Sequence, residues 1–479
     1  MFLSEEFLSK YPDFAPHQEP ISIFTYLRTY SRYLPEKGRR EVWKETVRRA
    51  VEFNVGLELN HRQKMGLPIN MDRMRREAEK LFDSIFNLRQ FPSGRTLWVG
   101  GAPNALAERF ALANFNCAFT NIDEWEDLCD LFYLLLVGTG VGFKRLLTMK
   151  DLPPIRNDIE VHHEPYHTVY PHVKQPETHV FFTKPEEARM EIGDSKEGWV
   201  EALRWWLRIH TDPKYQNIKR LSINYDYVRP AGSKLKTFGG TASGPEPLRE
   251  MFQLFDKTLR NQVDPYLDPP EEVAPGWVKA RPIHILDMGN AIGYNVVVGG
   301  VRRTAELFLM SANDWECILA KYGINGIWDE ERHQRIIQML RDLGVHDWAE
   351  KLGRMKVGDP NVRPLHHRRM SNNSIAFTEK PDQRLMHLIF EIMQGEGEPG
   401  FVNLRAAAMR RFKAIGIDNP TEEEIQEMMD RIGLNPCAEV ILQSKGVCNL
   451  TTVNVDAFVK NVMGTYMLDL EGLLEAQRM

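Results

Sequence analysis

Apolar side chains recur at helical spacing through the first part of the chain. One such face, in a segment otherwise rich in Arg, Lys and Glu, is formed by Trp43, Val47, Ala50 and Val51. A second stripe comes after Pro68 and consists of Met71, Met74, Ala78, Leu81 and Ile85. These Met positions fit core packing. The pattern predicts a mainly helical N-terminal region over residues 1–110.

From residue 111 onward, short apolar runs alternate with helical patterns. Residues 198–209 predict a Trp-rich helix, and strands are expected over residues 221–228, 295–301, 371–377 and 398–404. This alternation predicts an α/β fold, with an α/β barrel occupying residues 111–479. Two insertions interrupt it near residues 151–195 and 315–362, and the second is rich in charge and helical in pattern.

A helix with a clear start precedes the most unusual loop of the chain. Thr421 and Glu424 form a capping box. The apolar stripe behind it consists of Ile425, Met428, Met429 and Ile432. We expect Gly433 to end this helix, and Pro436 opposes any further helix in the next residues. Residues 434–440 are therefore predicted to be a loop held up by a packed helix, and residues 469–479 to be a short final helix.

The side chains of this loop combine three kinds of chemistry. Cys437 offers a redox-capable sulfur, Glu439 a proton acceptor and Asn435 a neutral amide. In an extended loop these alternate positions point the same way. The same residues also fit a small buried thiol and a solvated surface charge, and their spacing alone does not separate the two interpretations.

Composition and charge narrow the class of protein. The chain has 479 residues and a net charge of −5, which gives no electrostatic reason to expect nucleic-acid binding. The N-terminus runs directly into Ser4-Glu5-Glu6 and shows no signal peptide. The longest apolar run, residues 131–137, is too short to span a bilayer, so no membrane partner is expected. Five cysteines, an odd number, fit chemically used thiols in a reducing cytosol, and we expect a cytoplasmic protein.

Two segments suggest ligand sites that their spacing does not support. Residues 138–143 are rich in glycine, but the spacing is not that of a dinucleotide-binding loop, so we expect a tight helix-to-strand connection. Residues 151–195 hold five histidines, but Pro165 and Pro171 spoil helical spacing and no cysteine is near, so a surface insertion without a metal is predicted. Cys129 and Cys317 are expected to be structural.

Three other segments leave their roles open. Residues 238–247 form a Gly/Ser/Thr/Pro loop that fits either close approach to a nucleotide or a mobile surface loop. Arg302 and Arg303 fit phosphate contacts or pairing with Glu306. Residues 366–369, His-His-Arg-Arg, fit a solvated charge run leading into a strand.

Several motifs, in order along nearly the whole chain, resemble the large chain of ribonucleotide reductases. They are Thr25-Tyr26-Leu27-Arg28-Thr29-Tyr30, Pro92-Ser93-Gly94-Arg95-Thr96-Leu97-Trp98, Phe238-Gly239-Gly240-Thr241-Ala242-Ser243-Gly244-Pro245, Val301-Arg302-Arg303-Thr304-Ala305-Glu306-Leu307, Ser371-Asn372-Asn373-Ser374 and Gly397-Glu398-Pro399-Gly400-Phe401-Val402-Asn403-Leu404. Asn435-Pro436-Cys437-Ala438-Glu439, with Val447-Cys448-Asn449-Leu450 after it, looks like the family's finger loop. The likeness is greatest to the adenosylcobalamin-dependent (class II) ribonucleoside-triphosphate reductases, although Ala438 replaces a glycine usual there.

The resemblance implies a reaction and roles for the residues. Ribonucleotides, most directly ribonucleoside triphosphates, would be reduced to deoxyribonucleotides for DNA synthesis in a ten-stranded barrel around the finger loop. Residues 111–479 would form only the first part of this barrel. Cys437 would carry a thiyl radical, Glu439 would accept the 3′-hydroxyl proton and Asn435 would hold ribose hydroxyls. Cys117 and Cys448 would be the redox-active disulfide pair. Ser93 and Asn116 would contact substrate, although Ser93, in a Phe-Pro-Ser-Gly segment, fits a plain turn equally well.

The resemblance also implies partners. These are adenosylcobalamin, a deoxynucleotide effector and a dithiol reductant such as thioredoxin. Family members continue well beyond the position of Met479, so a C-terminal companion chain carrying the remaining strands is expected. Two alternatives remain: a class I-type large subunit whose radical comes from a separate metal-bearing subunit, and a nucleotide-binding fragment that is inactive without a partner chain.

Overall fold

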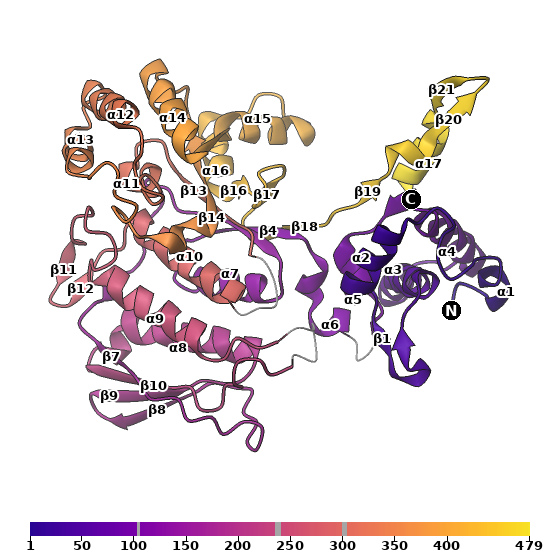
Figure 1. The fold of residues 1–479 in the computed structure, drawn as a ribbon, viewed down its shortest axis with the longest axis horizontal. Coiled ribbons are helices and arrows are strands. Elements are labelled where there is room, and N and C mark those ends of the chain that lie inside the picture. The colour runs from indigo at the N-terminus through magenta and orange to yellow at the C-terminus, as the bar shows by residue number, and fades with distance from the viewer. Residues whose placement is uncertain (103–105, 235–240, 299–303) are drawn as a thin grey trace. The chain divides into compact units, whose positions relative to one another are not determined.

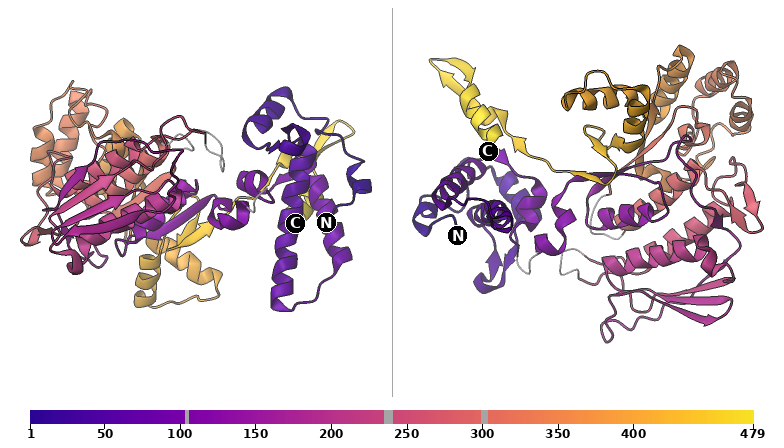
Figure 2. Two further views of the ribbon diagram at one scale, coloured as in Figure 1. Left: turned by 90° about the horizontal axis from the view of Figure 1, so that it is seen from below. Right: turned by 180° about the vertical axis from the view of Figure 1, so that it is seen from behind.

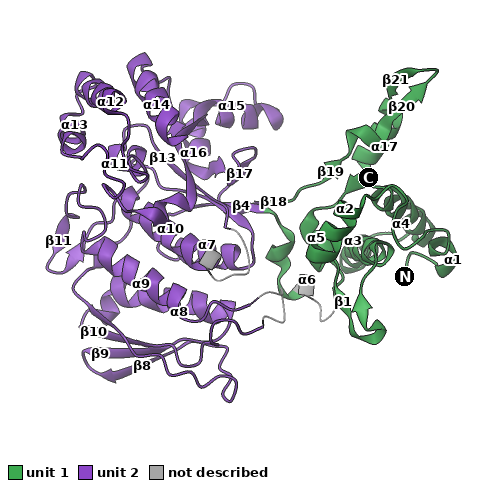
Figure 3. Ribbon diagram, viewed as in Figure 1, with its two compact units in different colours: residues 1–116, 448–479 green, residues 117–447 purple. Residues whose placement is uncertain are grey.

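The computed structural model describes residues 1–102, 106–234, 241–298 and 304–479. The chain divides into two compact units, the first formed by residues 1–116 and 448–479 and the second by residues 117–447 (Figure 3). The expected segments at residues 238–240 and 299–303, Arg302 and Arg303 included, lie outside the described residues. No helix among the described residues combines the length and apolar content needed to cross a membrane.

The first unit is mainly helical, as its sequence pattern predicts. Its helices are α1 (Glu5–Leu8), α2 (Pro20–Thr29), α3 (Trp43–Met65), α4 (Met71–Phe86), α5 (Gly94–Val99), α6 (Leu106–Arg109) and α17 (Leu470–Arg478). The two long helices α3 and α4 pack side by side (Figures 1 and 2). Val47, Ala78 and Ile85 lie in their shared core with no exposed surface. The predicted apolar faces and the final helix are confirmed.

Short strands complete this unit. They are β1 (Tyr33–Leu34), β2 (Arg39–Arg40), β3 (Gln90–Phe91), β19 (Thr452–Val453), β20 (Val459–Val462) and β21 (Thr465–Leu468), with short 3-10 turns at Pro35–Lys37, Ala111–Asn114 and Val455–Phe458. β19 pairs antiparallel with β3, which joins the end of the chain to its beginning within this unit. β20 and β21 form a hairpin.

The centre of the second unit is a six-stranded sheet in the order β15-β14-β13-β5-β4-β18 (Figure 1). Its strands are β4 (Cys117–Asn121), β5 (Gly140–Lys144), β13 (Glu306–Ser311), β14 (Ser371–Phe377), β15 (Gly400–Asn403) and β18 (Gly446–Cys448). The first five run parallel to their neighbours. The α/β class is confirmed. The expected barrel stays a prediction, with which this largely parallel sheet is compatible.

Helices cover both faces of this sheet. One face packs on α7 (Asp127–Leu136) and α10 (Pro282–Val298), and its inward residues include Val141, Phe143, Phe308 and Ile375. The other face packs on α15 (Leu404–Ala414) and α16 (Glu422–Arg431) through Leu307, Leu309 and Ala376. Because side chains alternate along a strand, residues 117, 119 and 121 of β4 and 140, 142 and 144 of β5 lie on the second face.

A second sheet belongs to the segment expected to be a surface insertion. Strands β7 (Glu160–His163), β8 (His179–Lys184), β9 (Glu187–Glu191) and β10 (Arg220–Asn224) pair in the order β7-β10-β9-β8. They pack on α8 (Lys196–Thr211) and α9 (Glu246–Leu259), and Trp206 is fully buried between them and the main core. A smaller sheet joins β6 (Ile155–Arg156), β11 (Glu272–Ala274) and β12 (Trp277–Val278). The Trp-rich helix is confirmed, and the strand expected over residues 221–228 ends at Asn224.

The segment at residues 315–362 is helical, as predicted. It holds α11 (Trp315–Ile318), α12 (Glu330–Asp342) and α13 (His346–Gly353), and α14 (Gln383–Glu396) packs against α12. The strands expected at 371–377 and 398–404 are present as β14 and β15. The strand expected over residues 295–301 is wrong where the chain is described, because residues 295–298 are the last turn of helix α10.

Candidate active site at the tip of the hairpin

The predicted loop is the tip of a short hairpin on the α15/α16 face of the sheet. Strands β16 (Ile432–Leu434) and β17 (Ile441–Gln443) pair antiparallel and enclose residues 435–440. The capping box that starts α16 is confirmed: Thr421 accepts from the N–H of Glu424, and the Glu424 carboxylate accepts from the N–H of Thr421. The loop is thus held up by a packed helix, as expected.

Gly433 does not end this helix by a left-handed turn, and that expectation is wrong. Helix α16 ends at Arg431, and Ile432 already has the extended angles φ −105° and ψ 158°. Gly433 is required for another reason. A Cβ atom there would lie 2.1 Å from the ring of Phe119 on β4, so only glycine lets the hairpin lie against that strand.

Two glycines of β5 make room for the rising strand of the hairpin. A Cβ atom on Gly142 would lie 1.7 Å from the carbonyl oxygen of Leu434, and one on Gly140 would lie 2.9 Å from the ring of Pro436. The glycine-rich segment after α7 is thus a helix-to-strand connection, as predicted, and Gly138 supplies its left-handed turn with φ +83°. Its bare strand surface lies against Leu434 and Pro436, the residues that lead to Cys437.

The loop itself is a tight turn, and the expected extended conformation is wrong. The N–H of Ala438 donates to the carbonyl oxygen of Asn435 at 3.0 Å, and Ala438 has φ +63°. This is a left-handed position at which glycine carries no steric cost. The expected grouping of side chains is nevertheless present, because the Asn435 amide donates to the Glu439 carboxylate at 2.7 Å.

Asn435 anchors the turn from within. Its side chain has no exposed surface, and its amide oxygen accepts from the N–H of Val440 at 3.1 Å while its amide nitrogen holds Glu439. Cys437 and Glu439, in contrast, are exposed at the tip. Asn435 thus binds within the turn through both its amide oxygen and its amide nitrogen, below the two exposed side chains.

The environment of Cys437 keeps its thiol protonated. Partial desolvation raises the pKa of Cys437, and the charge of Glu439, the nearby Cys117 and a hydrogen bond to Glu439 raise it further. Cys117 is buried at the start of β4, on the face that carries the hairpin. The thiolate is the nucleophilic form of cysteine, so this environment lowers the fraction of Cys437 that is in its nucleophilic form.

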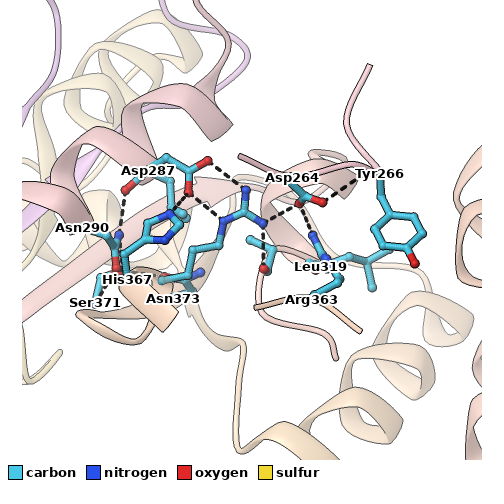
Figure 4. A network of polar contacts seen from close by, with 12 residues as sticks. Asp264, Tyr266, Asp287, Asn290, Leu319, Arg363, His367, Ser371 and Asn373 are labelled. Carbon is cyan, nitrogen blue, oxygen red and sulfur yellow. Dashed lines mark hydrogen bonds and ion pairs between the residues drawn. The ribbon is translucent and has the colours of Figure 1, made fainter. Parts of the chain in front are cut away.

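A third strand also holds the loop. The Asn372 amide on β14 donates to the carbonyl oxygen of Pro436 at 3.0 Å. The residues on either side of Asn372 point to the other face of the sheet: the N–H of Ser371 donates to Asn290 on α10, and its hydroxyl donates to Asn373 (Figure 4). The start of β14 is therefore fixed on both faces.

The expectation of a solvated charge run before β14 holds for only part of the segment. His366 and Arg369 are exposed, whereas His367 is half-buried and Arg368 is buried, so the expectation is wrong for these two. The Arg368 guanidinium has no exposed surface and binds Asp287 in bidentate fashion at 2.7 and 2.8 Å (Figure 4). It also donates to Asp264 at 2.8 Å, and Asp264 accepts from Arg363 as well. His367 contacts Asp287 at 2.7 Å. The two carboxylates come from distant parts of the chain, so no local pattern reveals this network.

The remaining expected site residues lie in or next to the first unit. Ser93 is buried and caps α5 by accepting from the N–H of Thr96 at 3.2 Å, which gives it a structural role. The N–H of Asn116 donates to the carbonyl oxygen of Cys448 at 3.1 Å, and its amide oxygen accepts from the N–H of Leu450 at 3.2 Å. Cys448 is half-buried.

The other expectations about metals and cysteines have these outcomes. Cys129 and Cys317 are buried with no exposed surface, so their structural role is confirmed. Among the residues that the structure describes, no group of three or more His, Cys, Asp or Glu side chains is arranged to hold a metal ion. Glu306 lies in the core on the α10 face, opposite the hairpin, and burial raises its pKa well above the ordinary range.

Sequence reasoning missed three residues that support the loop: Asn372, Asn121 and Lys144. Asn121 donates to the carbonyl oxygen of Asp430 at 2.8 Å, and Lys144 is fully buried below the hairpin. The sequence holds a signal, because residues 140, 142 and 144 are Gly, Gly and Lys and lie on one face of strand β5. A lysine in that row is out of place unless it binds polar atoms.

Comparison with known protein families assigns two parts of the chain. Residues 3–102 match the ribonucleotide reductase alpha domain, and residues 172–259 match the insertion domain of B12-dependent ribonucleotide reductase. The second match covers strands β8 to β10 with helices α8 and α9. It overlaps the insertion predicted at residues 151–195 only over residues 172–195, and it continues beyond that segment to residue 259. The resemblance to ribonucleotide reductases, and to their cobalamin-dependent class, is confirmed.

Individual relatives agree with this class. The chain is 30% identical over 473 residues to the adenosylcobalamin-dependent ribonucleoside-triphosphate reductase of Lacticaseibacillus paracasei, covering 91% of this chain and 54% of that protein. It is 30% identical over 486 residues to the protein of the same name from Lactobacillus leichmannii, covering 94% and 57%. The chain thus spans somewhat more than half the length of these curated relatives.

A solved structure supports the same fold. A crystal structure of a B12-dependent (class II) ribonucleotide reductase matches with a TM-score of 0.64 and 27% identity, over 94% of this chain and 58% of that one. The expectation of a C-terminal companion chain finds no support, because these class II relatives are single chains.

Proposed function

We propose that this chain carries the radical-bearing thiol of an adenosylcobalamin-dependent ribonucleoside-triphosphate reductase. The observation that supports this most directly is the hairpin tip, where Cys437 and Glu439 are exposed together above a buried Asn435. The names of the relatives and the matched insertion domain support the triphosphate substrate and the cobalamin cofactor.

Each residue of the tip has a step in this reaction. The Cys437 thiyl radical removes the hydrogen atom from C3′ of the ribose, and Glu439 accepts the proton of the 3′-hydroxyl. Asn435 donates to one carboxylate oxygen of Glu439 at 2.7 Å and so orients this carboxylate for the 3′-hydroxyl proton. At the end of the reaction Cys437 returns the hydrogen atom to C3′, so the thiyl radical is regenerated.

We propose that Cys117 and Cys448 supply the two electrons of the reduction. The 2′-hydroxyl leaves as water, and the two thiols lose two hydrogen atoms in total and end as a disulfide. The hydrogen bond between Asn116 and the Cys448 carbonyl supports this pairing, since Cys117 comes directly after Asn116 in the chain. Mass mapping after one turnover without reductant is expected to find a Cys117–Cys448 disulfide, and a bridge that includes Cys437 would contradict it.

The thiol chemistry of the tip fits the proposed cofactor. Adenosylcobalamin supplies a radical to a thiol, and Cys437 is exposed and kept protonated, as a hydrogen-atom donor must be. Cys437 is therefore the thiol to which the cofactor would supply the radical. Ser93 and Asn116 remain proposed substrate contacts, alongside a deoxynucleotide effector and a dithiol reductant such as thioredoxin.

The test is a product assay with the purified protein. It is incubated with a ribonucleoside triphosphate and a dithiol, with and without adenosylcobalamin. Deoxynucleotide that forms only with the cofactor is the expected result. Turnover that requires a separate metal-bearing subunit, with no response to cobalamin, would favour the class I alternative. Nucleotide binding with no product under either condition would favour the alternative of a nucleotide-binding fragment that is not active by itself.

A further inference from the structure

A buried cation lies at the base of the hairpin that carries Cys437. Lys144, the last residue of β5, has no exposed surface. Its ammonium donates to three backbone carbonyls: Met429 at 2.9 Å, Asp430 at 2.9 Å and Ile432 at 2.7 Å. An ammonium has three N–H donors, so every donor of Lys144 is used on this short piece of chain.

These carbonyls are the ones that a helix end leaves without partners. Met429 and Asp430 lie in the last turn of α16, whose final carbonyls have no intrahelical donor and carry the negative end of the helix dipole. The turn lacks a left-handed glycine that would satisfy them, because Ile432 is already extended. Lys144 takes the place of that cap, and the Asn121 amide adds a second donor to Asp430.

Burial and nearby charges both affect the pKa of the Lys144 ammonium. Burial lowers the pKa of Lys144 to about 8, while the carboxylates of Asp430 and Asp123 oppose this change. At pH 7 the charged form with three donors therefore predominates. The ammonium also lies 5.8 Å from the centre of the Phe119 ring, the same ring that contacts Gly433.

Lys144 and Gly142 together fix the path of the rising strand. Both lie on the same face of β5, two residues apart. Lys144 holds the carbonyl of Ile432, and Gly142 accommodates the carbonyl of Leu434, two residues further along the hairpin. Strand β5 thus determines, through Lys144 and Gly142, where the hairpin begins and where its tip emerges.

We infer that Lys144 is a positioning residue for the reactive loop: its ammonium joins the end of α16 to β16 and so sets where Cys437 and Glu439 emerge over β4 and β5. The catalytic importance of this position rests on the proposed function. The position itself rests only on the contacts of Lys144, so the two are tested separately.

The test measures the loop and not turnover. Hydrogen exchange of the amides in residues 432–443 and alkylation of Cys437 by iodoacetamide are followed at pH 7 in the purified protein. In Lys144→Ala the hairpin is expected to exchange about tenfold faster or more, since hydrogen bonds to a charged donor are lost. Cys437 is expected to alkylate faster, because a loosened loop removes the desolvation that keeps its thiol protonated.

Chemical rescue separates the charge from the space that the side chain fills. The part of the side chain that Lys144→Ala removes has the same carbon chain and ammonium group as n-propylammonium. This ion is therefore expected to restore slow exchange in Lys144→Ala. The neutral 1-propanol, of similar length, is expected not to. Lys351→Ala is the matched control: Lys351 is also buried, but it pairs with Asp268 and Asp347 away from the hairpin. Its hairpin exchange is expected to match the wild type.

Two results would overturn the inference. One is hairpin exchange and alkylation in Lys144→Ala equal to the wild type, and the other is equal rescue by 1-propanol. If Lys144→Ala does not fold, Lys144→Met is measured instead, since it fills the space without a charge. Wild-type exchange in Lys144→Met would overturn the inference, and selective loosening of residues 432–443 would support it. Wild-type turnover tests the proposed function independently.

Discussion

At the scale of single residues, the electrostatics of Cys437 are the most direct point to test. Desolvation raises the pKa of the Cys437 thiol, and the charge of Glu439 and a hydrogen bond to it raise this pKa further. In Glu439→Gln the negative charge is lost, so the pKa of Cys437 is expected to fall toward its ordinary value. The pH profile of the Cys437 alkylation rate is then expected to shift to lower pH.

The measurement is specific, because mass spectrometry of the labelled peptide separates Cys437 from the other cysteines. Glu427→Gln is the control, since Glu427 is an exposed carboxylate on α16 that pairs with Arg431. It is expected to leave the profile unchanged. An unchanged profile in Glu439→Gln would show that Glu439 does not act on the thiol.

Asn372 offers a second prediction at this scale. Its amide holds the carbonyl of Pro436, and its side chain is exposed, so Asn372→Ala is expected to change the free energy of unfolding by less than about 1 kcal/mol. Turnover is expected to fall about tenfold or more, because small displacements of a reacting group are costly. Gln338→Ala, which removes an exposed amide bonded to Asp342, is the control for both measurements. Full turnover in Asn372→Ala would remove Asn372 from the support of the loop.

At the scale of elements, the bare surface of β5 decides whether the hairpin fits. In Gly142→Ala the new Cβ atom would lie 1.7 Å from a backbone oxygen, so the hairpin must move away from the strand. We expect faster hydrogen exchange in residues 432–443 and loss of turnover. Gly353→Ala, at the end of α13 with no atom within 4 Å of the new Cβ, is expected to stay within about 0.5 kcal/mol of the wild type. Equal behaviour of the two variants would contradict the packing described for β5.

Elements with strong local signals are predictable from the sequence. The capping box before α16, the paired apolar faces of α3 and α4, and strand β14 are each indicated by a short pattern. The end of α10 is not, because a short apolar run fits a buried strand as well as a buried helix. Gly433 was expected to end the helix through its backbone conformation. Instead, a glycine is needed there because the residue packs closely against Phe119, on a strand that lies far away in the sequence.

The candidate site shows the same division between local and distant information. Asn435, Cys437 and Glu439 lie within five residues, so their grouping is visible in the sequence. Lys144, Asn121 and Asn372 act on the loop from three different strands, and only the fold brings them to it. Arg368 illustrates the limit most clearly, since its two carboxylate partners lie 81 and 104 residues earlier.

At the scale of the molecule, the buried ionic network before β14 is expected to contribute to stability. Burial alone would raise the pKa of Asp287, but the charge of Arg368 and its hydrogen bonds hold that pKa well below the ordinary range. A lowered native pKa means that this stability is present above the unfolded value of about 4 and is lost as the pH falls below it.

Asp287→Asn is therefore expected to cost about 3–5 kcal/mol at neutral pH, because it leaves Arg368 with one carboxylate fewer in a buried site. The difference from the wild type is expected to shrink below about pH 4. Denaturant unfolding at several pH values measures it. Asp382→Asn is the control, since Asp382 is exposed, pairs with Arg384 and caps α14 as asparagine also can. A pH-independent difference for Asp287→Asn would contradict the assigned charge.

The central claim is that Cys437 is the reactive thiol of a ribonucleotide reductase, and one measurement tests it most directly. Deoxynucleotide formation with adenosylcobalamin and a dithiol is compared in Cys437→Ser and Cys317→Ser. Serine has no thiol to form a thiyl radical, whereas Cys317 is buried in the core beside Asp314, where a hydroxyl finds an acceptor. We predict that turnover is lost in Cys437→Ser and retained in Cys317→Ser, and sustained turnover in a folded Cys437→Ser protein would contradict the claim.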